Sequence, residues 1–431
     1  MRSNQKNAFI PNARSVAERK PKLILVTTVG LTLRSFFQGQ ITYLKNKGFE
    51  VIAVSSGGPD LEEFARREQL PVHAITMTRG ISPLADLIAA VRLWILFLKI
   101  RPVIVHGHTP KAGVLSMLAA TFARVPVRFY TLHGVMSEIR RGPARSLLKL
   151  MEWTACVLAD QALAVSRSVM DGVVLQHLCS ERKIKVLECG SCNGIDAVSR
   201  FNPANLDQNK KQELRSHFCL DENSIVIGFV GRLVRDKGVV ELASAWKRIR
   251  NAYDDSRLLM IGPAESHNPV PNGILQELAD DDRVIMLDFV ANDDMPTYYG
   301  IMDIVVLPSY REGFPYVVLE ASAMGLPVVA AEVTGCVDAV AEGETGMLVP
   351  PRDAQALVEA IRIYIEDPEL RMKHGQAGRE LVLAHYKPEP IWEALSAEYS
   401  LSMGCKGLSF SSLTHSEPGA PSSLSERGHV A

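Results

Sequence analysis

The sequence predicts an α/β protein made of two doubly wound, parallel-sheet domains that face each other across a cleft. The chain has 431 residues, too many for one ordinary hydrophobic core. Apolar strand-like runs alternate with helix-period segments, and this series occurs twice. A stretch rich in turn residues, 193–208, separates the two series and marks the boundary between the domains.

The first series predicts seven buried strands, with helices such as 35–47, ended by Gly48, between them. These strands are expected at 22–29, 51–55, 72–77, 103–106, 128–133, 161–166 and 185–189. The second series predicts strands at 225–230, 257–261, 284–289, 304–308, 327–331 and 347–349. The resulting domains are 21–200 and 208–385, with a helix at 386–402 that returns to the first domain. The polar ends, 1–20 and 404–431, are expected to be disordered.

Charge divides the chain into a basic and an acidic half. Residues 1–200 hold 27 Lys and Arg against 14 Asp and Glu, and residues 201–431 hold 20 against 34. The basic half predicts an anionic partner. Nucleic acid is not expected, because no base-stacking motif or recognition helix is present. An anionic membrane surface fits better, and the chain shows no secretory signal, so we expect a cytoplasmic protein at the inner face of the plasma membrane.

Two segments bear on this membrane prediction. Residues 138–150 set Arg140, Arg141, Arg145 and Lys149 among leucines, a pattern typical of interfacial helices, although an ordinary solvated helix shares it. The very apolar helix 85–100 is too short to span a bilayer comfortably. We interpret it as a buried or half-buried core helix, with partial contact to a membrane surface as the alternative.

Two glutamates eight positions apart mark a strand-to-helix junction in the second half. Glu312 follows the apolar run 304–308 in a loop, and Glu320 lies in the next helix among valines and alanines. Such a pair is often solvated, but a carboxylate in apolar surroundings needs a partner or a ligand. Gly313 and Pro315 shape the turn, where backbone N–H groups at a helix start can face an anion or a sugar. Open α/β sheets bind ligands at this edge, so we expect the pair in the cleft.

Two cations follow the first strand of the second domain. Arg232 and Lys237 lie in the loop of residues 228–238, directly before a helix. A forked guanidinium and a point-charge ammonium there suit a diphosphate, whereas solvated loop cations are the alternative. The loop matches neither GxxxxGK[ST] nor GxGxxG, which argues against ATP hydrolysis and an ordinary NAD site.

The first domain offers candidates at its own strand ends. Gly30 follows the first strand and would let backbone approach a phosphate. His133 ends the run FYTLH and is expected to contact ligand in the cleft, and Lys111 starts a helix where it would meet an anionic acceptor. His106 and His108 lack a third local metal ligand.

No metal site is predicted elsewhere either. Cys189 and Cys192 form a single C-x-x-C without a second pair, and the seven cysteines are scattered. The aspartate runs 280–282 and 293–294 are interpreted as solvated turns.

The residues together resemble a known family. GRLVRDKG at 231–238 and YREGFPYVVLEASAMGLPVVA at 310–330 resemble the retaining glycosyltransferases of family 4, which have the GT-B fold, over roughly residues 21–400. The segments HGHTPKAGVLSMLAA, RVPVRFYTLHG and SCNGID are further similar to the subgroup that extends lipid-linked capsule, O-antigen or glycan precursors in bacteria.

The resemblance implies a role for each candidate of the cleft. Arg232 and Lys237 would hold the donor diphosphate, Glu320 the ribose hydroxyls, Glu312 the donor sugar, and His133 a sugar hydroxyl from the opposite domain. These enzymes need neither metal nor cofactor, because cationic side chains and a helix dipole stabilise the leaving diphosphate.

Backbone groups would complete the donor site. The resemblance implies that Gly30 lets the first loop approach the phosphates and that the amides around Gly313, Phe314 and Pro315 orient the sugar. The partners would be a UDP-sugar and an undecaprenyl-diphosphate-linked saccharide. A nucleotide-sugar 2-epimerase of the same architecture and a non-catalytic scaffold for polysaccharide assembly are the alternatives.

Overall fold

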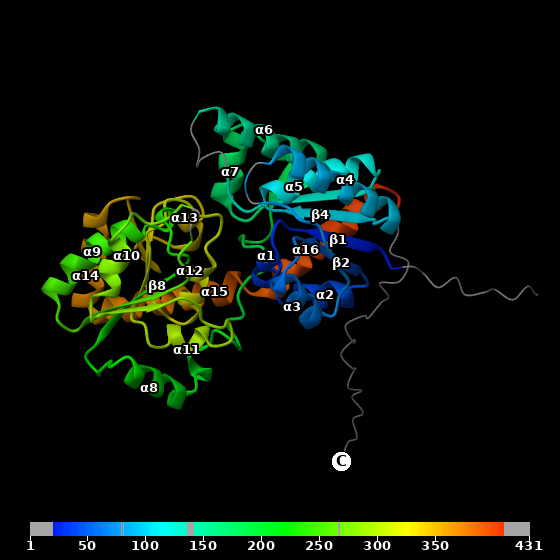
Figure 1. Ribbon diagram of the computed structural model, residues 1–431. Helices are drawn as coiled ribbons and strands as arrows, with labels where there is room; N and C mark the ends of the chain where they lie inside the picture. Colours follow the sequence, from blue (N-terminus) through cyan, green and yellow to red (C-terminus); the bar gives the residue numbers. More distant parts are fainter. Residues whose placement is uncertain (1–19, 79, 81, 136–141, 266–267, 409–431) are drawn as a thin grey trace, which may run out of the picture.

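The chain folds into two parallel sheets, seen in a computed structural model that describes residues 20–78, 80, 82–135, 142–265 and 268–408 (Figure 1). The first sheet has the order β3-β2-β1-β4-β5-β6-β7. Its strands are β1 Lys22–Val26, β2 Glu50–Ser55, β3 Val72–Ala74, β4 Ile104–His108, β5 Val127–Leu132, β6 Gln161–Ala164 and β7 Ile184–Val186. The second sheet has the order β10-β9-β8-β11-β12-β13. Its strands are β8 Ile225–Val230, β9 Ser256–Ile261, β10 Val284–Leu287, β11 Ile304–Leu307, β12 Val328–Ala331 and β13 Gly346–Val349.

Each sheet is buried on both faces, as the continuous apolar runs predict. In β1, Ile24 and Val26 join one core cluster, while Leu23 and Leu25 join another on the opposite face. This follows from the two-residue period of a strand. The predicted class, two doubly wound α/β domains, is confirmed.

Helices cover both faces of the first sheet. One face carries α4 to α7, and the other carries α1 to α3 together with α16 from the end of the chain. Their bounds are α1 Gly30–Phe36, α2 Gln40–Asn46, α3 Pro59–Glu68, α4 Pro83–Ile100, α5 Pro110–Phe122, α6 Pro143–Leu158, α7 Arg167–Leu175 and α16 Pro388–Cys405.

The second sheet is covered in the same way. The helices α9, α10 and α14 pack on one face, and α11, α12, α13 and α15 pack on the other, where the core is continuous with that of the first domain. The remaining bounds are α8 Gln208–His217, α9 Val239–Ala252, α10 Ile274–Ala279, α11 Met295–Tyr299, α12 Tyr316–Ala323, α13 Cys336–Ala339, α14 Ala354–Glu366 and α15 Pro368–His385.

The single helix predicted over 35–47 is wrong. The structure has two helices there, α1 and α2, with Gly39 between them in the left-handed region at φ 76°. A Cβ on Gly39 would lie 2.6 Å from the Trp392 ring, so the break accommodates α16.

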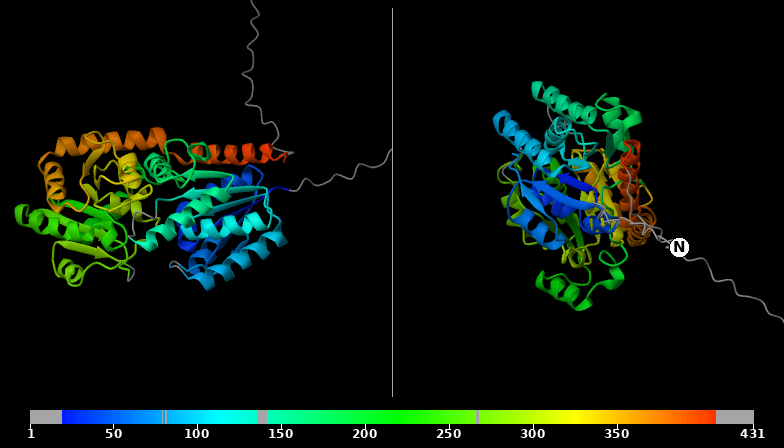
Figure 2. Two further views of the ribbon diagram at one scale, coloured as in Figure 1. Left: turned by 90° about the horizontal axis from the view of Figure 1, so that it is seen from above. Right: turned by 90° about the vertical axis from the view of Figure 1, so that its right-hand side faces the viewer.

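The chain crosses between the domains twice. The first crossing follows β7, over residues 187–207, and the second is the short turn between α15 and α16. Figure 2 shows α15 and α16, orange and red, lying end to end from the second domain to the first. The returning helix continues to Cys405, so it extends past the predicted end at 402 and into the predicted disordered tail. The expectations for residues 1–19 and 409–431 lie outside the described residues.

The segments predicted to touch a membrane are partly described. Arg140 and Arg141 lie outside the described residues, whereas Arg145 is exposed in the first turn of α6. The apolar helix α4 is half-buried: Ala89, Leu93 and Phe97 face the core. Among the helices the structure describes, none has the length and apolar character needed to cross a membrane.

Candidate functional site

Two loops of the second domain contact each other at the carboxyl end of its sheet. They follow β8 and β11, which pair directly. Gly238 ends the first loop at φ 72°, and a Cβ there would lie 2.6 Å from the carbonyl carbon of Pro308. The Tyr310 amide donates to the Asp236 carbonyl, 2.8 Å away. A glycine is required at 238 both by its left-handed backbone and by this close approach.

The contact between the two loops brings the predicted Lys237 and Glu312 into an ion pair. The Lys237 Nζ lies 2.5 Å from the Glu312 Oε1, and the side chains are 22% and 12% exposed. Charge-assisted hydrogen bonds of this kind are among the strongest that side chains form. The structure therefore places one predicted phosphate ligand directly beside the predicted sugar ligand.

Arg232 has a different carboxylate partner. Its guanidinium Nη1 lies 2.7 Å from the Glu265 Oε2, and its side chain remains 45% exposed. Exposed pairs of this kind contribute little to stability, so the guanidinium can exchange partners at low cost.

Glu320 lies apart from the ion pair and lines a cavity between the domains. The Tyr299 hydroxyl donates to its Oε2 at 2.8 Å. Burial raises the pKa of Glu320, and this hydrogen bond and the charge of Arg200 lower it in part. The cavity measures about 390 Å³. The first domain, the crossing segments and the second domain all contribute to its walls, among them Phe36, Gln38, Asn193, Arg200, Asn292, Tyr316, Glu320 and Trp392.

His133 follows β5 on the facing side of the junction. Its ring stacks on Phe36, with centroids 5.2 Å apart, and its Nε2 lies 3.2 Å from the His108 Nδ1. Burial lowers the pKa of His133 to about 4, so the ring is neutral at pH 7. Burial also lowers the pKa of His108, so one of these two nitrogens donates its N–H to the other, and this hydrogen bond fixes the orientation of His133.

The two domains approach each other closely at the backbone of Gly313. A Cβ on this glycine would lie 2.6 Å from the His133 carbonyl carbon. A Cβ on Gly335 would lie 2.7 Å from the Gly313 carbonyl carbon, so Gly313 is enclosed from both sides. Phe314 packs its ring on Tyr386 at 5.4 Å, and Pro315 is the N-cap of α12. The predicted loop thus holds the domains together through backbone and ring contacts.

Lys111 is placed differently from the prediction. It is buried, its Nζ lies 2.6 Å from the Asp86 Oδ1, and it also donates to Thr78 and Gly80. These partners hold the ammonium inside the first domain, so it is not available to an anionic acceptor. Gly30 starts α1, and a Cβ there would lie 2.7 Å from the Leu61 amide, which shows that packing against α3 requires the glycine.

The remaining polar motifs have structural partners. His106 is buried between the Tyr399 hydroxyl at 2.6 Å and the Thr131 hydroxyl at 2.7 Å. The Cys192 thiol lies 3.0 Å from the Tyr316 hydroxyl, and burial raises its pKa to about 12. Across the part of the chain that is described, no three His, Cys, Asp or Glu side chains come together in a way that could hold a metal.

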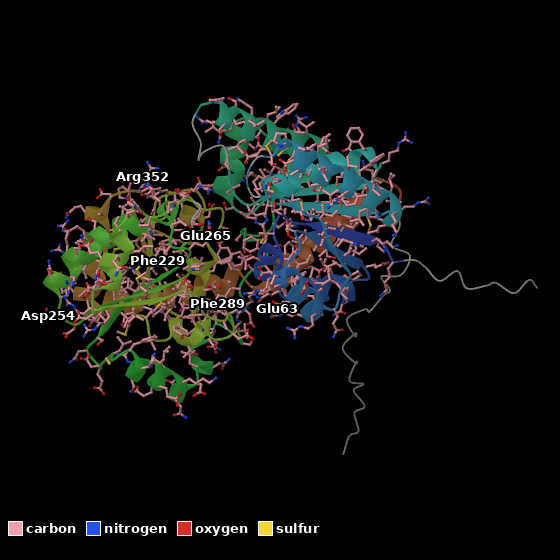
Figure 3. The ribbon with its side chains drawn as sticks, in the orientation of Figure 1. Glu63, Phe229, Asp254, Glu265, Phe289 and Arg352 are labelled. Carbon is pink, nitrogen blue, oxygen red and sulfur yellow. The ribbon has the colours of Figure 1, made fainter. Side chains whose placement is uncertain are left out.

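Several residues of the junction were not predicted from the sequence. Tyr316 stacks on Phe36 at 5.5 Å, so the rings of His133, Phe36 and Tyr316 form a column across the domains. Arg34 places its guanidinium 5.9 Å from the centre of the Phe289 ring. Figure 3 shows Phe289 and Glu63 on facing sides of this junction. No local motif marks these side chains, because each finds its partner only when the domains meet.

Family models match both halves of the chain. The model for glycosyltransferase family 4 matches residues 38–191, and the model for glycosyl transferases group 1 matches residues 210–381. The chain is 35% identical to the capsular polysaccharide biosynthesis glycosyltransferase CapM of Staphylococcus aureus, over 89% of this chain and 97% of that protein. It is 26% identical to the UDP-Gal:alpha-D-GlcNAc-diphosphoundecaprenol alpha-1,3-galactosyltransferase of Escherichia coli, over 79% and 86%.

Solved structures show the same architecture. A glycosyltransferase from Rickettsia africae superposes with a TM-score of 0.72 at 23% identity, over 89% of this chain and 99% of that one. HepE of Anabaena, solved in complex with UDP and glucose, gives a TM-score of 0.71 at 21% identity, over 88% and 99%.

Proposed function

This chain belongs to glycosyltransferase family 4, and on that premise we propose that it transfers a sugar from a UDP-sugar to a lipid-linked saccharide during synthesis of a surface polysaccharide. The family predicted from the sequence is confirmed. The relatives named above support the donor and acceptor classes, because one acts in capsule synthesis and another uses UDP-galactose and a diphosphoundecaprenol-linked sugar.

The observation that carries the proposal is the pairing of Lys237 with Glu312 beside the Gly313 contact. A diphosphate entering the loops after β8 and β11 would replace the carboxylates that now face Lys237 and Arg232. Lys237 and Arg232 would then stabilise the negative charge that grows on the departing diphosphate. Glu312, released from Lys237, would accept hydrogen bonds from the donor sugar.

The transfer exchanges one bond for another at the anomeric carbon. The bond from this carbon to the diphosphate oxygen breaks, a bond to an acceptor hydroxyl oxygen forms on the same face, and the acceptor proton passes to a phosphate oxygen of the released UDP. His133, neutral at pH 7, would contact a sugar hydroxyl without adding charge. Glu320 would bind the ribose hydroxyls from the cavity between the domains. We propose that no metal takes part.

The decisive experiment incubates the protein with a panel of UDP-sugars and a lipid-diphosphate sugar acceptor, and reads product masses. Addition of one sugar mass to the acceptor, lost in Glu312→Ala, is the expected result. Release of UDP with an epimerised sugar in the absence of acceptor would support the epimerase instead. If calorimetry detects no binding of any UDP-sugar, both the glycosyltransferase and the epimerase hypotheses are refuted, and the non-catalytic scaffold is the hypothesis that remains.

We further propose that the enzyme works in the cytoplasm, at the inner face of the plasma membrane, where a lipid-linked acceptor is accessible. The basic first half of the chain and the exposed Arg145 of α6 support this location. Fractionation of Arg145→Glu, together with Arg140→Glu and Arg141→Glu, tests it: an unchanged distribution between membrane and soluble fractions would contradict this proposal.

A further inference from the structure

Helix α4 is apolar on two opposite sides, and only one of them has a protein partner. Ala89, Leu93 and Phe97 face the core. The other side is a stripe at helical spacing whose members are 39–72% exposed: Leu84, Leu87, Ile88, Val91, Trp94, Ile95 and Leu98. A solvent-facing helix normally presents polar residues on that side.

Helix α6 repeats this pattern. Its exposed stripe consists of Leu147, Leu150, Trp153 and Val157, which are 41–56% exposed. Both helices pack on α5, which lies between them, so the two stripes belong to one helical layer of the first domain (Figure 1). Two exposed apolar stripes on one layer of a domain indicate an interaction site. We call α4 and α6 with these stripes the α4–α6 face.

The exposed charges of this face are all positive. Arg92, Lys99 and Arg145 are exposed, and Lys149 is half-buried. The acids of the two helices are covered: Asp86 is paired with Lys111, and Glu152 is 1% exposed. At the end of α4 a cavity of about 700 Å³ adds further cations, with walls that include Lys20, Lys22, Lys99 and Arg101.

We propose that the α4–α6 face docks on an anionic lipid bilayer, with the apolar stripes at the boundary of headgroups and acyl chains and with lipid phosphates at the cationic cavity. The proposal rests on the proposed function, which requires access to a lipid-linked acceptor. Helices that lie at a membrane interface typically combine an aromatic and aliphatic stripe with flanking basic residues. The proposed docking surface therefore includes α4 as well as Arg145 and Lys149 of the predicted segment 138–150.

A second copy of the chain is a poorer occupant of this face. In a two-fold symmetric contact the same patch meets itself, so Arg92 and Lys99 would be brought toward the corresponding cations of the other copy. No exposed carboxylate of α4 or α6 would compensate them. An anionic lipid surface supplies the missing negative charge, at about 1 kcal/mol for each basic residue near it.

The first test removes the apolar stripe. A variant with Leu87→Gln, Val91→Gln and Ile95→Gln is compared with wild type in flotation with vesicles of phosphatidylcholine and phosphatidylglycerol. Its control carries Ile363→Gln, Met372→Gln and Leu401→Gln, which are also exposed but lie on other elements. The α4 variant should lose vesicle binding, and the control should keep it.

The second test removes charge. Arg92→Gln with Lys99→Gln should weaken partition onto the same vesicles about 30-fold, from about 1 kcal/mol for each cation. Lys210→Gln with Lys373→Gln, on the second domain, should leave it unchanged. Wild type should bind vesicles of phosphatidylcholine alone more weakly, and added salt should weaken binding to the anionic vesicles.

Two outcomes would overturn the proposal. One is an α4 triple variant that binds vesicles like wild type. The other is a wild-type dimer in sedimentation that becomes monomeric in this variant, because a second copy would then cover the face. Transfer to a short-chain, water-soluble acceptor is measured in parallel and should be unchanged in the variant. If wild type does not transfer sugar to this water-soluble acceptor, the proposed function is refuted. The flotation result still decides whether the α4–α6 face binds vesicles.

Discussion

Gly313→Ala should separate the two domains at the contact between Gly313 and His133, and should reduce activity far more than stability. The φ angle of Gly313 lies outside the left-handed region, so alanine is compatible with the backbone and only space opposes it. The new Cβ would lie 2.6 Å from the His133 carbonyl carbon. Two carbon atoms in contact need about 3.5 Å, so the loop must retreat by about 1 Å.

A displacement of about 1 Å at a catalytic site can cost about 100-fold in rate, which is the expected loss in kcat/KM for sugar transfer. The assay is initial-rate kinetics with the donor and acceptor found by mass, beside a thermal unfolding curve. Gly404→Ala, whose Cβ meets nothing within 4 Å, is the control and should retain full activity. Wild-type kcat/KM in a folded Gly313→Ala protein would refute the spatial argument.

Three further predictions follow from the charges and hydrogen bonds of the structure. Lys237→Met should lower kcat about 10²–10³-fold, because it removes a cation that stabilises the departing diphosphate. It should also lower Tm, because Glu312 loses its ion-pair partner. A kcat near the wild-type value would exclude this role of Lys237. Tyr299→Phe should raise the pKa of Glu320, because the lost hydrogen bond lowers it, so the acid limb of UDP binding measured by calorimetry should move to higher pH; an unmoved limb would contradict the contact. Burial lowers the pKa of His106 to about 3, so the unfolded chain takes up a proton below about pH 6.5 that the folded chain refuses. The free energy of unfolding should therefore fall as pH drops from about 6.5 to 3, by about 1.4 kcal/mol per unit from this residue, and denaturant titrations should show a shallower slope in His106→Gln.

Much of the second domain could be predicted from the sequence. The strands β8 and β11 are uninterrupted apolar runs, and the loops after them carry the residues that a parallel sheet gathers at one edge. Lys237 and Glu312 meet for that reason, since their strands are neighbours. Local pattern and sheet topology were enough here.

The first domain shows where such reasoning stops. Lys111 begins a helix, as an anion ligand would, but its ammonium is neutralised by Asp86 from the preceding helix. The interruption of helix 35–47 depends on Trp392, which arrives from the other end of the chain. His108 reaches His133 because β4 and β5 pair in a register that sets His108 opposite Thr131. Each outcome depends on a tertiary contact that no local pattern contains.

The return of α16 to the first domain has a consequence for the order of biosynthesis. Leu395, Tyr399 and Met403 share a core cluster with Leu23 and Leu25 of β1. During translation the strand emerges first and the helix that covers it emerges last. The first domain therefore cannot complete its core before α16 has been synthesised, and a chain truncated before Pro388 would leave Leu23 and Leu25 without this cover.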